Sequence, residues 1–226
     1  MASNRFTVTL TAQALAKATA DGLSLPPAVA HALARVSALL PGPPTTITVS
    51  YASSAQVIPQ TGTDGYTDPD TGGITIGFRQ TPQASLSTII QLWLPRTFSH
   101  EIDHSVRILA GPGFGGSLLE QLITEGISSA LDIAAFPGTP EPYDRAITRS
   151  QECSLWKQAQ PLLRQSGLYD QWMFGGGGIP HWTGFTIGYD IVTDYHQRHP
   201  DTDWAAITAA SAATILAGSH YQPCSS

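Results

Sequence analysis

The sequence is poor in charged residues and contains no basic cluster. Only 12% of its 226 residues are Asp, Glu, Lys or Arg, which is about half the share usual in globular proteins, and the net charge is −6. Nucleic acids and anionic membranes both bind proteins through patches of Lys and Arg. We therefore expect neither a nucleic acid nor a membrane as a partner.

Long apolar runs are also missing. No segment reaches the roughly 18 apolar residues that a membrane-spanning helix requires. Residues 1–22 hold no apolar stretch of the kind that marks a signal peptide. These absences predict a cytoplasmic protein, and they leave its oligomeric state open.

Cysteine is scarce. Cys153 and Cys224 are the only two, and they do not have the spacing of a metal site. Two free thiols are the simpler interpretation, and a single disulfide is the alternative.

Glycine and proline are plentiful, at 21 and 17 residues, so loops should be numerous. The length suggests one domain over residues 1–226 with a sizeable core, beginning with a helical region at 1–44. Apolar spacing predicts helices over residues 10–23, 26–42, 85–110, 117–135, 143–165, 185–199 and 203–218, and strands over 45–53 and 73–78. Because the strands come early and helices dominate later, the class should be α+β, with a small N-terminal sheet and a mainly helical C-terminal half.

The stretch SHEIDHS contains the pattern His-Glu-x-x-His, formed by His100, Glu101 and His104. On a helix, residues four apart are separated by about 40° in projection, so both imidazoles share one face and can reach one Zn²⁺. Glu101 is then placed to act on a metal-activated water without being a ligand itself. The alternative is a helix with a surface glutamate and two unrelated histidines.

The helix that carries this motif also has an apolar stripe. Its members recur every four residues: Leu94, Phe98, Ile102 and Val106. The stripe predicts that one face is anchored in the core while the histidine face opens to a cleft. Pro95 should either kink the helix or lie in its first turn. Asp103 should be solvated or salt-bridged at the helix surface.

A catalytic zinc site needs a third protein ligand. Glu125, on the next predicted helix, is the candidate, because a helix hairpin of this length can return its carboxylate to the metal. Glu120 competes, but it lies three residues after Ser117, where a capping box would use it. The alternative is that Glu125 is an ordinary solvated glutamate. Asp132 or a backbone carbonyl could orient a ligand histidine.

These motifs resemble the gluzincins, in which a glutamate follows His-Glu-x-x-His by about twenty residues. More narrowly, the chain resembles the family of predicted zinc-dependent proteases. The resemblance covers roughly residues 70 to 220. Besides the motif it rests on Glu125-Gly126 and on a C-terminal block whose matching residues are Trp172, Phe174, Gly175, Pro180, Trp182, Gly184, Gly188 and Tyr189. Phe185 departs from the pattern, because a tyrosine is expected there.

The resemblance implies a zincin-like fold, with residues 45–226 as the catalytic core, and a zinc-dependent metallopeptidase acting on a peptide or protein. Zinc would be held by His100, His104 and Glu125, with Glu101 as general base. Tyr189 and His181 are candidates to stabilise the oxyanion, although they could equally be a packing residue and a loop residue.

Two further expectations concern function. A zinc-bearing binding or regulatory module without turnover is the alternative to a peptidase. If the chain is a peptidase, the predicted strand at 73–78 could lie at the edge of the sheet and accept a substrate peptide as an added strand.

Overall fold

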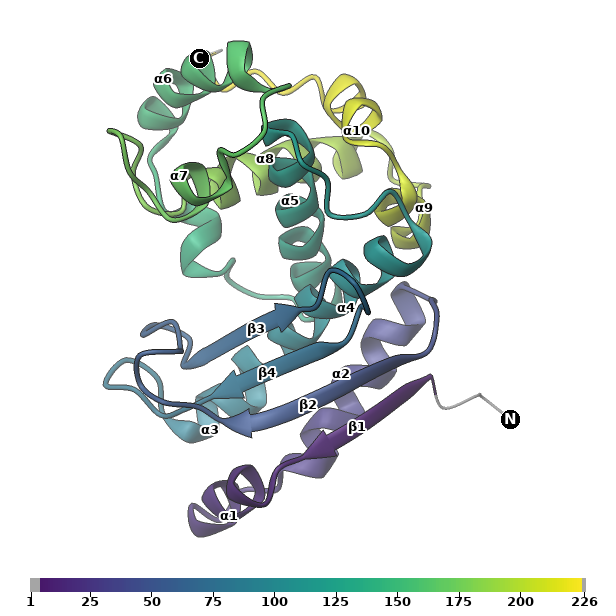
Figure 1. Cartoon of the computed structure of the whole chain (residues 1–226), viewed down its shortest axis with the longest axis vertical. Coiled ribbons are helices and arrows are strands. Elements are labelled where there is room, and N and C mark those ends of the chain that lie inside the picture. Colours follow the sequence, from purple (N-terminus) through teal and green to yellow (C-terminus); the bar gives the residue numbers. More distant parts are fainter. Residues whose placement is uncertain (1–4, 225–226) are drawn as a thin grey trace. The chain divides into compact units, whose positions relative to one another are not determined.

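The computed structural model describes residues 5–224, which form a four-stranded sheet and a larger number of helices (Figure 1). The chain is α+β and mostly helical, as the sequence predicts. Its described residues divide into two compact units: residues 5–110 with 131–137, and residues 111–130 with 138–224. The long helix α5 contributes to both units.

The first unit contains the sheet. Its strands are β1 (Phe6–Leu10), β2 (Thr45–Tyr51), β3 (Thr63–Thr67) and β4 (Ile74–Phe78), in the order β1-β2-β4-β3. β1, β2 and β4 run parallel, and β3 is antiparallel to β4. Ile47 and Val49 of β2 face the core, whereas Thr46 and Thr48 are exposed, which is the alternation expected of a sheet covered on one face.

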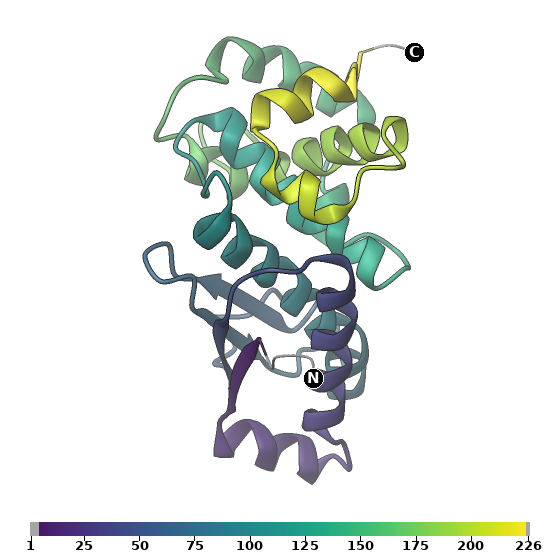
Figure 2. The ribbon, with the colours of Figure 1, turned by 90° about the vertical axis from the view of Figure 1, so that its right-hand side faces the viewer.

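The covering helices of this unit are α1 (Ala12–Ala20), α2 (Leu25–Leu39), α3 (Leu86–Thr88) and α4 (Leu94–Ala110), together with a π-helical turn over Ile89–Trp93. α2 lies to one side of the strands when the sheet is seen from the side (Figure 2). α4 packs against β3 and β4 and next to α2. The sheet therefore supports the helix that carries the His-Glu-x-x-His motif.

The sheet corrects one expectation. β4, the strand predicted at residues 73–78, pairs with β2 on one side and β3 on the other. It is a central strand, so a peptide cannot add to it. The edge strands of the sheet are β1 and β3. Neither was expected from the sequence, and the turn-forming residues Asp64 and Gly65 of β3 gave no strand signal.

Pro95 lies in the first turn of α4, directly after the π-helical turn. Proline has no N–H to donate and its ring crowds the carbonyl four residues earlier. The wider turn accommodates this, since the N–H of Leu94 donates to the carbonyl of Ile89, five residues back.

The second unit is helical. It contains the N-terminal part of α5 (Leu118–Ala135), followed by α6 (Arg149–Ala159), α7 (Tyr169–Met173), α8 (Thr183–Arg198), α9 (Trp204–Ala209) and α10 (Ala212–Ser219), with 3-10 turns over Pro142–Arg145 and Gln160–Leu162. The helices predicted over residues 143–165 and 203–218 are thus each divided into shorter elements. In the last of them Ser211 starts a new helix, because its side chain accepts a hydrogen bond from the N–H of Thr214.

α5 and α8 approach each other closely through two glycines. A Cβ atom added at Gly126 would collide with the backbone carbonyl of Gly188, and one added at Gly188 would collide with the carbonyl of Leu122. Only glycine fits at both positions. The Glu125-Gly126 pair and the glycine before Tyr189 therefore have a packing role in this unit.

Cys153 and Cys224 form a disulfide that ties α6 to the segment after α10. The expectation of two free thiols is therefore wrong, because the two sulfur atoms, 71 residues apart in the sequence, are brought together by the fold. The cytoplasmic location stays a prediction, and this bond weighs against it because disulfides persist mainly in oxidising compartments. Within residues 5–224, none of the helices has the length and apolar character of a membrane span.

Candidate metal centre

The two histidines of the motif lie side by side on α4. Their ring centroids are 4.7 Å apart with the planes nearly perpendicular, at 88°. Both are buried, with exposed fractions of 8% for His100 and 5% for His104. The spacing of four residues thus places both imidazoles together, as the helix periodicity predicts.

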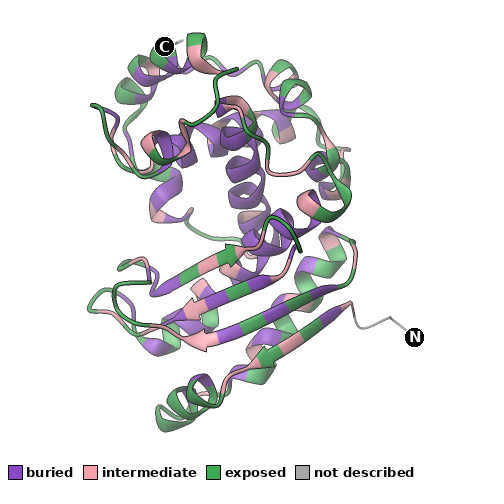
Figure 3. Cartoon of the chain, in the orientation of Figure 1, coloured by how far each residue is buried: buried purple, intermediate pink, exposed green. Residues whose placement is uncertain are grey.

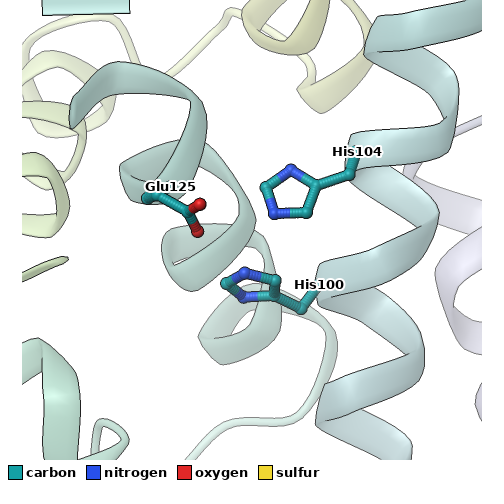
Figure 4. A group of neighbouring side chains, drawn as sticks. All are labelled: His100, His104 and Glu125. Atoms are coloured by element: carbon teal, nitrogen blue, oxygen red, sulfur yellow. The ribbon is translucent and has the colours of Figure 1, made fainter. Parts of the chain in front are cut away.

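Glu125 faces these imidazoles (Figure 4). The potential ligand atoms of His100, His104 and Glu125 all lie within 4.8 Å of one another, and all three side chains are buried. Within residues 5–224, no other group of three or more His, Cys, Asp or Glu side chains is arranged to hold a metal ion.

The donor set fits zinc. Two imidazole nitrogens and one carboxylate oxygen are typical of catalytic zinc sites, which leave a fourth position open. Ligands of a tetrahedral zinc at about 2.0–2.1 Å lie about 3.3 Å from one another. The three side chains are within about 1.5 Å of that spacing, a difference that small side-chain rotations can close.

Glu125 and Glu120 have different environments on α5. Glu120 closes a capping box: its carboxylate accepts hydrogen bonds from the backbone N–H (2.9 Å) and the hydroxyl (2.7 Å) of Ser117. The predicted use of Glu120 as a cap is confirmed. Glu125 is buried about one and a half turns further along. Its exposed fraction is 2%, so it is not a solvated helix glutamate.

Asp132 supports one of the histidines. Its Oδ2 lies 3.4 Å from Nδ1 of His100, and the carboxylate is fully buried. Burial raises the pKa of Asp132 to about 6, although the contact with His100 lowers it. A carboxylate at Nδ1 fixes the ring and leaves Nε2 for a metal. Of the two orienting groups considered from the sequence, the structure places Asp132 in this position.

Glu101 is held by strand β3. The hydroxyl of Thr67 donates a hydrogen bond of 2.6 Å to Oε2 of Glu101 and lies 3.0 Å from its carbonyl oxygen. A Cβ atom at Gly65 would collide with the Glu101 side chain, so only glycine leaves room for this carboxylate. The pKa of Asp64 is raised to about 6, even though Asp64 reaches solvent. The larger cause is partial desolvation, and the second is the negative charge of Glu101.

The surroundings of α4 differ from the expectation in two ways. Asp103 is fully buried, so it is not solvated at the helix surface, whereas the alternative of a salt bridge stays a prediction. The apolar stripe is buried as predicted, but all the remaining residues from 98 to 107 are buried as well (Figure 3). α4 is enclosed on all its faces, so the distinction between a core face and an open face does not hold for this helix.

Tyr189 and His181, the two oxyanion candidates, both belong to the second unit. Tyr189 is buried on α8, where the Arg145 guanidinium lies 4.8 Å from its ring centroid. Burial raises the pKa of Tyr189, and the negative charge of Asp144 is the second cause in the same direction. The phenol therefore keeps its proton at neutral pH. His181 is exposed and packs against the ring of Trp182. Their catalytic roles stay predictions.

The phenol of a different tyrosine, Tyr169, contacts the proposed ligand Glu125. The hydroxyl of Tyr169 donates a hydrogen bond of 2.7 Å to Oε1 of Glu125. No sequence pattern selects Tyr169, because it lies 44 residues from Glu125 and just outside the glycine- and tryptophan-rich block.

Residues 28–217 match the family described as "Predicted Zn-dependent protease (DUF2268)", and the chain belongs to that family. No curated protein and no solved structure matches the chain.

Proposed function

We propose that this member of a family of predicted zinc-dependent proteases is a gluzincin-type metallopeptidase with a zincin-like catalytic core. The observation that carries the proposal is the buried group of His100, His104 and Glu125, which offers two nitrogens and one oxygen to one ion. Glu101, adjacent to the first ligand and held by Thr67, supplies the acid–base group that hydrolysis requires.

Zinc bound by these three residues would supply a Lewis acid that polarises the scissile carbonyl and makes water acidic enough to attack near neutral pH. Glu101 accepts the proton of the attacking water and later delivers it to the leaving amine. The Thr67 hydroxyl keeps the Glu101 carboxylate in one orientation. Asp132 holds the ring of His100. Tyr189 and His181 remain the candidate donors to the oxyanion.

A peptide substrate would add to β3. Within residues 5–224 this edge strand pairs only with β4, so its other side has backbone groups for a further strand. β3 also carries Thr67 and Gly65, which contact Glu101. A peptide on that edge lies next to the proposed general base, which favours β3 over the strand selected from the sequence.

The test compares peptide hydrolysis by the zinc-loaded chain and by Glu101→Gln. A mixture of peptides is incubated with each protein, and new termini are identified by mass spectrometry. The variant should retain zinc and lose activity by roughly 10²–10⁴-fold. Zinc binding without hydrolysis in the wild type would instead support a zinc-bearing module without turnover.

A further inference from the structure

The side chain of Tyr169 donates a hydrogen bond to the carboxylate of the proposed ligand Glu125. Tyr169 opens α7, and its hydroxyl lies 2.7 Å from Oε1 of Glu125. This hydrogen bond joins two elements that are far apart in the sequence. A carboxylate held at one oxygen presents its other oxygen in a defined direction.

The ring of Tyr169 is itself held between two aromatic residues. The ring centroids of Phe114 and Phe174 each lie 5.7 Å from that of Tyr169, at interplanar angles of 68° and 79°. Edge-to-face pairs of this geometry are favourable. Rotation of the phenol away from Glu125 would break both contacts.

Phe114 is tied to the helix that carries Glu125. The hydroxyl of Thr124 donates a hydrogen bond of 3.1 Å to the carbonyl oxygen of Phe114. The glycines on either side, Gly113 and Gly115, have φ values of 81° and 82°, which let the loop turn back toward α5. Thr124, Phe114, Tyr169 and Glu125 therefore form a closed chain of contacts within the second unit.

We propose that Tyr169 is a positioning residue of the metal centre, which orients the Glu125 carboxylate so that one oxygen accepts the phenol hydrogen bond and the other is directed to the metal. The proposal rests on the proposed function, since it assumes that Glu125 is a zinc ligand. It gives Glu125 the same kind of support that Asp132 gives His100. Partners of this kind change metal affinity by about 10–100-fold when they are removed.

The experiment measures zinc affinity by competition with a chromophoric chelator. It uses the wild type, Tyr169→Phe, which removes only the hydroxyl, and Tyr51→Phe as a control that removes a hydroxyl from the sheet. Tyr169→Phe should weaken zinc binding by about 10–100-fold. Tyr51→Phe should leave zinc binding unchanged. Thermal unfolding of the metal-free proteins checks that both variants are folded.

A double-mutant cycle distinguishes positioning from a general structural effect. In the Glu125→Ala background, Tyr169→Phe should cause no further loss of zinc affinity, because the carboxylate through which it acts is gone. The visible spectrum of the Co²⁺-substituted protein should change in Tyr169→Phe, since the geometry of the carboxylate ligand is altered. An equal loss of affinity with and without Glu125 would overturn the inference.

Two failures can be told apart. If the wild type binds no zinc, the proposed function and this inference fall together. If the wild type binds zinc through Glu125 but Tyr169→Phe binds it equally well, with an unchanged Co²⁺ spectrum, only the role of Tyr169 is refuted.

Discussion

The contact between α5 and α8 makes a sharp prediction for Gly126→Ala. In an exposed helix this substitution would be stabilising, because alanine is favoured over glycine by about 1 kcal/mol. Here the new Cβ would collide with the carbonyl of Gly188 on the neighbouring helix. A backbone carbonyl cannot rotate away as a side chain can, so the two helices must separate.

Overpacking of this kind costs typically about 1–3 kcal/mol, and the rigid neighbour places this case at the upper end. After the gain in helix propensity is subtracted, we expect the free energy of unfolding to fall by about 2 kcal/mol. For a chain of this length, that lowers Tm by about 4–8 °C. Because Glu125 is the adjacent residue, movement of α5 should also weaken zinc binding.

The assay is thermal unfolding of the metal-free protein, followed by zinc titration of the folded variant. Gly184→Ala is the matched control. It also lies in α8, but a Cβ there meets mainly the flexible thioether of Met173, so its stability should change less. If Gly126→Ala is as stable as the wild type, or more stable, the helices are not in backbone contact and the reasoning is refuted.

Three further predictions concern other parts of the chain. Thr67→Val should slow peptide hydrolysis by roughly 10-fold or more without loss of zinc, because a hydrogen bond to a charged group is removed. Cys153→Ser should lower the free energy of unfolding by about 4 kcal/mol, since the disulfide closes a loop of 71 residues. Asp190→Asn should gain stability relative to the wild type as the pH rises from 4 to 7. Burial and the nearby Glu152 raise the pKa of Asp190 to about 6 despite its ion pair with Arg145. The stability linked to this raised pKa is full below about pH 4 and is lost above pH 6, a difference of about 3 kcal/mol.

Each of these has its own control. Thr48→Val, on the exposed face of the sheet, should leave hydrolysis unchanged; an equal loss would show that the Thr67 effect is not specific. The free energy of unfolding of Cys153→Ser should not change when a reductant is added, whereas that of the wild type should fall. Denaturant unfolding gives the free energy of unfolding of Asp190→Asn and of the wild type at several pH values. The difference between the two proteins should grow from pH 4 to pH 7, and a constant difference would contradict the assigned pKa.

Local patterns were sufficient to predict the proposed ligands. His100 and His104 are related by helix periodicity alone, and Glu120 could be assigned to a cap because a capping box is confined to four residues. That assignment left Glu125 as the third candidate, and the structure brings it to the histidines.

The features that were missed depend on contacts between distant segments. β3 is a strand because it pairs with β4 and because Gly65 leaves room for Glu101, although its residues favour turns. Tyr169 reaches Glu125 across 44 residues. The disulfide likewise joins distant positions. None of these contacts produces a periodic pattern in the sequence, so they could not be predicted from helix and strand periodicity.

The metal centre can be tested most directly by measuring zinc per chain by mass spectrometry after reconstitution and removal of loosely bound metal. The set is the wild type, His100→Ala, His104→Ala, Glu125→Ala and the control Glu120→Gln, which changes a capping carboxylate on the same helix. We predict one zinc per chain in the wild type and in Glu120→Gln. In the other three variants zinc binding should be so weakened that most of the zinc is removed together with the loosely bound metal. A wild type without zinc, or full zinc retention in Glu125→Ala, would contradict the three-ligand centre.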